Sequence, residues 1–185
     1  MEQMEQPGEA CLSLYRGKFL ELLKEGRWEY VRRVNASGAV MIVAVTKEGE
    51  LLLVEEYRVP LHARTVGLPA GISGDEGEES TLQSARRELE EETGYRADSW
   101  TYLFAGPSSP GLTTEMVSFY LAEDLHRISA GGVAHENITV HRIPLPQVHD
   151  WLMEQMGQGK VVDPKIFMGL YFLSCCGNGM GQKAS

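Results

Sequence analysis

The chain has 185 residues, of which 43% are hydrophobic and 23% charged, a balance typical of a globular rather than a disordered protein. This length suits one domain with a sizeable core and an additional arm. The formal net charge of −9 argues against broad contact with nucleic acid, because binding its backbone requires a basic face. An acidic chain is compatible with a site for divalent cations.

The cysteine pattern and the N-terminal residues indicate a cellular location. Cys11, Cys175 and Cys176 contain no C-x-x-C pair, which argues against a zinc or redox motif, and this odd number suits a reducing compartment. The first ten residues lack the basic start and apolar core of a signal peptide. No apolar run approaches the roughly 18 residues that span a bilayer. We therefore expect a cytoplasmic protein without membrane contact.

The first half of the chain predicts a tail, strands and a loop. Residues 1–10 are expected to form a loose tail, and residues 12–34 short strands or hairpins around a turn near "KEGR". Residues 39–45 and 51–57 are predicted strands joined by a hairpin-like turn, and the first is apolar enough to be buried on both faces. Residues 68–79 are expected to form a turn-rich loop.

A helix is predicted over residues 81–93. Ser80 and Gln83 form an S-x-x-Q capping box, and Gly94 stands where a left-handed residue ends a helix. An apolar stripe for the core consists of Leu82, Ala85 and Leu89.

The second half of the chain predicts further strands and helices. Residues 116–122 and 138–143 favour strands, whereas residues 146–156 and 163–173 favour helices. Asp163 caps the last helix. Strands interleaved with a few helices indicate an α/β or α+β sandwich.

Four glutamates lie within five residues of the predicted helix, at positions 88, 90, 91 and 92. Glu88, Glu91 and Glu92 have the i, i+3, i+4 spacing that places them on one face. Two interpretations remain open from the charge run alone. Either the face is merely solvated, or it binds a cation.

The surroundings of these glutamates form a longer pattern. Residues 87–95 read R-E-U-x-E-E-x-G-U, where U is bulky and apolar, and Glu79 precedes Arg87 by eight residues. This resembles the Nudix box, G-x5-E-x7-R-E-U-x-E-E-x-G-U, and the match from Glu79 to Tyr95 is complete. Gly71 lies eight residues before Glu79, where the pattern has six, so we infer a two-residue insertion in "ISGDEGE". The resemblance implies an α/β/α sandwich with a mixed sheet.

The resemblance also implies a metal site. Carboxylates are hard oxygen ligands suited to Mg²⁺, with Mn²⁺ as an alternative. The expected ligands are Glu88, Glu91, Glu92 and the backbone carbonyl of Ala70, with Glu91 and Glu92 also counted as catalytic.

Other residues of this region have separate expected roles. Arg87 is interpreted as a structural clamp for Glu79 or Glu91. Glu90 is expected to be solvated. The general base implied by the resemblance is Glu136, with His135 and Glu92 as alternatives.

Four segments outside the box are "GRWEYVRR", "LLLVEEYRVP", "LPAGI" and "SSPGLTTEMVSFYLA". They resemble the ADP-ribose pyrophosphatase and nucleoside-diphosphate-sugar branch of the Nudix hydrolases. They imply that Trp28 stacks on the nucleobase and that Arg58 contacts the diphosphate or base, although Trp28 could instead be a packing aromatic and Arg58 could pair with Glu55 or Glu56. The segment "SPGLTTE" resembles the family's loop near the terminal ribose, which implicates Gly111 and Glu115. The branch often has Glu at position 67 and Gln at position 56, where this chain has Gly and Glu.

The expected organisation is a tail and β arm over residues 1–37, which dimerises, and a Nudix hydrolase domain over residues 38–185. The expected activity is Mg²⁺-dependent hydrolysis of ADP-ribose to AMP and ribose 5-phosphate by a homodimer. GDP-mannose or another nucleotide sugar is the alternative substrate. A non-catalytic ADP-ribose sensor is the alternative of another class.

Overall fold

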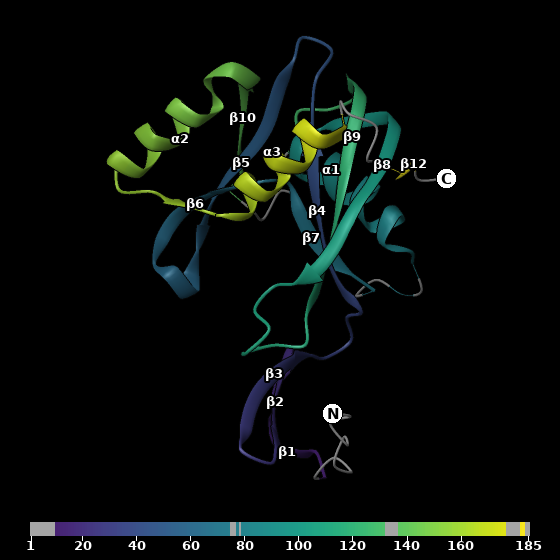
Figure 1. Ribbon diagram of the computed structural model, residues 1–185, viewed down its shortest axis with the longest axis vertical. Coiled ribbons are helices and arrows are strands. Elements are labelled where there is room, and N and C mark those ends of the chain that lie inside the picture. Colours follow the sequence, from purple (N-terminus) through teal and green to yellow (C-terminus); the bar gives the residue numbers. More distant parts are fainter. Residues whose placement is uncertain (1–9, 75–76, 78, 132–136, 177–181, 184–185) are drawn as a thin grey trace, which may run out of the picture.

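The computed structural model describes residues 10–74, 77, 79–131, 137–176 and 182–183 (Figure 1). The helices are α1 (Thr81–Thr93), α2 (Val148–Gly157) and α3 (Lys165–Cys176), with short 3-10 turns η1 (Val59–Leu61) and η2 (Leu145–Gln147). The strands are β1 (Leu12–Arg16), β2 (Leu20–Glu25), β3 (Trp28–Arg33), β4 (Gly38–Ala44), β5 (Glu50–Arg58), β6 (Ala63–Gly67), β7 (Ala70–Ser73), β8 (Tyr95–Pro107), β9 (Met116–Arg127), β10 (Thr139–Pro144), β11 (Val161–Val162) and β12 (Gln182–Lys183). None of the described helices is both long and apolar enough to cross a membrane.

The first three strands form an antiparallel sheet, which we call the arm, and it projects from one end of the molecule (Figure 1). The prediction of short strands between residues 12 and 34 is therefore confirmed. Strands β2 and β3 are joined by two residues, and Gly26 has a φ of 56°, as the first central residue of a type II′ turn requires. This turn places Glu25 directly opposite Trp28.

The rest of the described chain forms two sheets between layers of helices. One sheet has the order β10-β5-β6-β11 and the other β12-β8-β9-β4-β7. Strands β4 and β9 are parallel, as are β6 and β11, whereas the other pairs of strands are antiparallel. Helix α1 packs on one side of the core, and α2 and α3 pack on the other. The expected α/β/α sandwich with mixed sheets is confirmed.

Strand β4 connects the two halves of the core. Val40 and Ile42 pack in the cluster beneath α1, whereas Met41 and Val43 pack in the cluster beneath α2 and α3. All four side chains are buried, so the prediction that this strand is covered on both faces is confirmed.

The prediction of a hairpin between β4 and β5 is correct for the turn but wrong for the pairing of the two strands. Gly49 has a φ of 75°, and the Thr46 amide donates to the Glu50 carbonyl at 2.9 Å, so a tight turn does form. One antiparallel bridge, Val45 with Leu51, then joins the two segments, and the strands separate into different sheets. Each strand finds a longer partner elsewhere, β9 for β4 and β10 for β5.

Five strands lie where the sequence predicts none, namely β6, β7, β8, β11 and β12. Strand β7 begins inside the expected loop and pairs with β4, so that prediction is wrong for residues 70–73. Its sequence, AGIS, is too short for a readable alternation. Strands β6 and β8 were not identified either, and β8 carries polar residues over a half-exposed face that weaken the apolar pattern.

A buried carboxylate ties several elements of the β5 sheet together. Glu55 is 5% exposed and accepts hydrogen bonds from Arg64 on β6 and from Lys160, whose Nζ lies 2.8 Å away. His141 on β10 lies 2.9 Å from the same carboxylate. Burial would raise the pKa of Glu55, but the hydrogen bonds from Lys160, Arg64 and His141 outweigh it and lower the pKa to about 2.

We predict that this carboxylate gives the protein an acid-sensitive component of stability. Since the folded-state pKa lies below the ordinary 4.5, the contribution is complete above pH 4.5 and is lost as the pH falls toward 2. Glu55→Gln should lower the free energy of unfolding by about 3 kcal/mol at pH 7, because it leaves the cations without their counter-charge. Urea unfolding at several pH values measures this. If the difference in the free energy of unfolding between wild type and Glu55→Gln did not shrink between pH 5 and 3, the stabilising role of the Glu55 carboxylate would be contradicted.

Candidate active site

Helix α1 has well-defined ends that fix its glutamates in register. The Ser80 hydroxyl accepts from the Gln83 amide, and the Gln83 side chain accepts from the Ser80 amide, so the predicted capping box is confirmed. Gly94 ends the helix with a φ of 73°. With the apolar stripe packed in the core, the neighbouring acidic face is directed along strand β7.

The backbone of β7 lies against two of the glutamates. The Ala70 amide donates to Oε2 of Glu92 at 3.0 Å, and Glu92 is only 5% exposed. Glu88 is also largely covered, and a Cβ built on Gly71 would overlap its carboxyl group. Only glycine at position 71 therefore allows the Glu88 carboxylate to lie against this strand.

Arg87 binds three carboxylates at once. Its Nη2 donates to Glu79 and to the Ile72 carbonyl, at 3.1 and 3.2 Å, and its Nη1 donates to Glu88 and Glu91, at 2.8 and 3.2 Å. Burial would lower the pKa of the guanidinium, but the hydrogen bond with Glu79 and the charges of Glu88 and Glu79 raise it further above its usual range. The interpretation of Arg87 as a clamp is confirmed, and it extends to Glu88.

Glu90 differs from its expected role. It was expected to be solvated, but its two oxygens accept from Nε and Nη2 of Arg96, at 2.6 and 2.9 Å. Hydrogen bonding with Arg96 lowers the pKa of Glu90. Because Glu90 points away from β7 toward the start of β8, the structure separates it from Glu88, Glu91 and Glu92.

The expected metal ligands fit a hard cation by their chemistry. Glu88, Glu91, Glu92 and the backbone of Ala70 are all oxygen donors around one short strand, and Gly71 leaves the space that the Glu88 carboxylate occupies. In this conformation the described residues contain no group of three acidic, histidine or cysteine side chains close enough to bind one ion. Glu88 and Glu91 are directed to Arg87, and Glu92 to the Ala70 amide.

A separate pocket on the arm contains two of the predicted substrate-binding residues. Trp28 and Gly111 line a cavity of about 410 Å³ together with Glu25, Tyr30, Pro110, Thr113 and Thr114. Trp28 is 57% exposed, which contradicts the alternative that it is an ordinary packing aromatic within this chain. Among the described residues, no hydrogen bond or ion pair joins this pocket to α1.

The loop between β8 and β9 holds this pocket against the arm. The Val31 amide donates to the Leu112 carbonyl at 2.8 Å, and the Thr114 amide donates to the Val31 carbonyl at 3.1 Å, so the loop extends the arm sheet beside β3. Glu115, a predicted substrate residue, pairs with Arg33 at the end of β3. The loop and the arm therefore position Trp28 and Gly111 as one unit.

Arg58 lies at the end of β5 on the same side of the sheet as α1. Side chains alternate along a strand, so Arg58 and Glu56 share the face of Leu52, which packs in the cluster beneath α1. Nη2 of Arg58 lies 2.5 Å from Glu56. The alternative in which Arg58 pairs with Glu56 is therefore confirmed, and its contact with a substrate stays a prediction.

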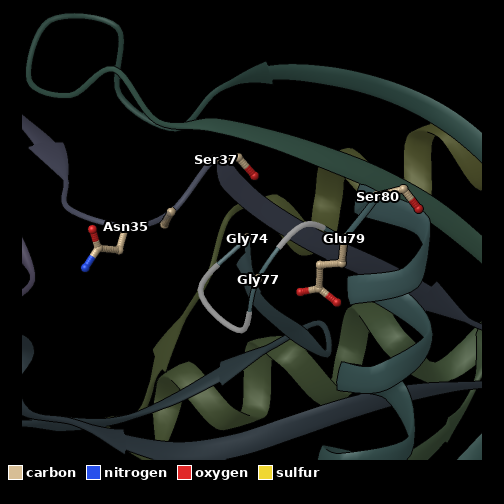
Figure 2. Close-up of a pocket in the computed structure, with 7 residues that line it drawn as sticks. Asn35, Ser37, Gly74, Gly77, Glu79 and Ser80 are labelled. Carbon is tan, nitrogen blue, oxygen red and sulfur yellow. The ribbon is translucent and has the colours of Figure 1, made fainter.

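A larger cavity, of about 640 Å³, lies at the start of α1 (Figure 2). Figure 2 shows Glu79 and Ser80 on one side of it and Asn35 and Ser37 on the other. Burial would raise the pKa of Glu79, but hydrogen bonds from Arg87 and Ser84 lower it, so the carboxylate is charged. The described lining residues include a negative charge and no positive one, which makes this cavity poorly suited to a phosphate.

The predicted general base, Glu136, and its alternative His135 lie outside the described residues. Glu25 and Tyr30 were not identified from the sequence, although both line the pocket of Trp28. A signal for Glu25 was present: a two-residue turn, Gly26 and Arg27, obliges the residues on either side to face each other.

Comparisons with known proteins identify the family of the chain. A family model described as NUDIX domain matches residues 36–162. The chain is 38% identical over 131 residues to the ADP-ribose pyrophosphatase of Bacillus subtilis, across 68% of this chain and 70% of the relative. It is 30% identical over 146 residues to the GDP-mannose pyrophosphatase of Yersinia enterocolitica, across 75% and 73% of the two chains.

A solved structure shares the fold over nearly the whole chain. A crystal structure of an ADP compounds hydrolase superimposes with a TM-score of 0.71 at 25% identity, covering 94% of this chain and 95% of the other. The NUDIX match spans most of the chain and includes β7, α1 and the complete pattern from Glu79 to Tyr95. The protein therefore belongs to the NUDIX domain family.

Proposed function

We propose that this protein is an Mg²⁺-dependent pyrophosphohydrolase that cleaves ADP-ribose to AMP and ribose 5-phosphate. The observation that carries the proposal is the packing of Glu88 and Glu92 of α1 against the backbone of Gly71 and Ala70. If this helix face were merely solvated, its carboxylates would not have to pack so closely against the strand. The ADP-ribose pyrophosphatase among the relatives supports the choice of substrate.

In this proposal Glu88, Glu91, Glu92 and the carbonyl of Ala70 would hold Mg²⁺, or Mn²⁺ in its place. The bound ion would offset the charge of the diphosphate and make a water molecule more acidic. Arg87 keeps Glu88 and Glu91 beside each other, and the Ala70 amide fixes Glu92. These contacts hold the three carboxylates beside β7, and the side chains would have to move closer together to bind one ion.

The reaction itself is a hydrolysis of the diphosphate bridge. The oxygen of a water molecule forms a bond to one phosphorus, the bond from that phosphorus to the bridging oxygen breaks, and the second phosphate leaves. We assign the removal of the water proton to Glu136, with Glu92 as the alternative. Arg58 would contact the diphosphate. Because Gly111 lines the same pocket as Trp28, we assign it to the nucleobase end of the substrate rather than to the terminal ribose, and Glu115 keeps its assignment to the ribose.

A product assay tests the proposal. The enzyme is incubated with ADP-ribose, GDP-mannose and other nucleoside-diphosphate sugars, with Mg²⁺ and with Mn²⁺, and the products are separated. AMP with ribose 5-phosphate supports the proposal. GMP with mannose 1-phosphate at higher kcat/KM would favour the second candidate, which the Yersinia enterocolitica relative supports. Binding of ADP-ribose without any turnover would identify a sensor instead.

Trp28→Ala is expected to raise KM about tenfold and to leave kcat nearly unchanged. Stacking of a base on the exposed ring contributes about 1–3 kcal/mol, equally in the ground state and the transition state. Steady-state kinetics with the substrate found in the product assay measures both constants. A fall in kcat at constant KM would show that Trp28 acts on the chemical step rather than on binding.

We also propose that the protein is a homodimer in which the arm reaches the partner's site. The arm exposes large apolar side chains that the described residues leave uncovered: Leu12, Leu14, Tyr15, Phe19, Leu20 and Trp28. Such a concentration of apolar surface is typical of an interface. Sedimentation should give twice the monomer mass, and deletion of residues 1–34 should abolish both the dimer and activity. A fully active monomer after this deletion would refute it.

A further inference from the structure

The pocket of Trp28 contains an acidic group whose position the turn fixes. Glu25 and Trp28 are cross-strand partners in the arm, so their side chains emerge side by side on one face of the sheet. A flat ring lying on Trp28 would present its edge to Glu25. At about 410 Å³ the pocket lies within the range of small-molecule sites.

One oxygen of Glu25 is already engaged by the protein. The Tyr30 hydroxyl donates to Oε2 of Glu25 at 3.1 Å, and Tyr30 also contacts Sγ of Cys11 at 3.5 Å. The contact with Cys11, burial and the bond to Glu25 raise the pKa of Tyr30 to about 12, so the phenol remains a donor at neutral pH. Within the described part of the chain, Oε1 of Glu25 has no hydrogen-bond partner. The pocket thus offers one charged acceptor beside the aromatic surface.

We propose that Glu25 selects the nucleobase by accepting a hydrogen bond from the exocyclic amino group of adenine while the ring stacks on Trp28. A carboxylate can only accept, so it favours a base whose edge carries an amino donor and disfavours one that presents a carbonyl oxygen there. A bond to a charged acceptor contributes more than a neutral one, and leaving it unmade in a pocket costs binding. This inference rests on the proposed function.

The test compares two substrates that differ only in the amino group. These are ADP-ribose and its analogue with unsubstituted purine as the base, assayed with wild type, Glu25→Ala and Glu25→Gln. Wild type should show at least about tenfold lower kcat/KM with the analogue, mainly through KM. In Glu25→Ala the kcat/KM values for the two substrates should differ by less than about twofold, because the amino group has lost its partner. Glu25→Gln keeps an acceptor oxygen and should retain part of the preference.

The matched control is Glu29→Ala. Glu29 lies on the next strand but on the opposite face of the arm, so this variant should keep the wild-type ratio of kcat/KM for the two substrates. A loss in Glu25→Ala that is equal for both substrates would show a structural role and overturn the proposal. So would a wild-type enzyme that hydrolyses both substrates equally well. If wild type hydrolyses neither, the proposed function itself fails, and this result is distinct from the other two.

Discussion

Glu92→Gln is expected to lower kcat by at least about 10²-fold while the protein remains folded. The carboxylate is 5% exposed and accepts a hydrogen bond from the Ala70 amide at 3.0 Å. The amide oxygen of glutamine can accept that same bond, so the packing of α1 on β7 should survive. The negative charge is what the substitution removes, and loss of charge stabilisation at a reacting phosphate costs about 10²–10³ in rate. Steady-state kinetics in Mg²⁺ measures the effect.

Two neighbouring substitutions make this expectation specific. Glu91→Gln should also lose about 10²-fold, because Glu91 shares with Glu88 the clamp provided by Arg87. Glu90→Gln should leave kcat within about twofold of wild type, since Glu90 is bound to Arg96 away from β7. It should alter stability by less than about 1 kcal/mol, as exposed ion pairs usually do. If Glu90→Gln and Glu91→Gln lowered kcat equally, the assignment of one face of α1 to catalysis would be contradicted.

The parts of the site that could be predicted are those encoded locally. Helix α1 is bounded by Ser80, Gln83 and Gly94, whose capping roles depend on residues within one turn. The face shared by Glu88, Glu91 and Glu92 follows from the helical repeat alone. The tight turn at Gly26 is equally local, which is why strands were expected on both sides of it.

The parts that could not be predicted depend on distant partners. The chain from Glu50 was expected to fold back on β4, but β10 provides a longer ladder to β5 from far along the sequence. Arg96 follows the helix, and nothing in the local pattern shows that it turns back to Glu90. Glu25 and Gly111 line one pocket because the β8–β9 loop lies beside the arm, and this meeting of distant segments is visible only in the folded chain.

Gly71→Ala is expected to abolish most activity at little cost in stability. A methyl group at position 71 would overlap the carboxyl end of Glu88, and that end of a flexible side chain can swing away, whereas the strand need not move. The fold should therefore persist, with a change in the free energy of unfolding below about 1 kcal/mol. The displaced carboxylate would no longer lie beside Ala70 and Glu92. We expect kcat to fall about 10²-fold, since small misplacements in an active site have effects of this size.

Gly157→Ala provides the matched control for this substitution. A Cβ at position 157, in the last turn of α2, meets nothing within 4 Å, so activity should be unchanged and stability should rise slightly. Binding of Mn²⁺ without substrate separates the two ways in which Gly71→Ala could act. Weaker Mn²⁺ binding together with lower kcat would show that Glu88 must lie against residue 71 to serve as a ligand. Wild-type kcat in a stably folded Gly71→Ala protein would show that the close approach of Glu88 to β7 is not required, and the observation that carries the proposed function would then lose its force.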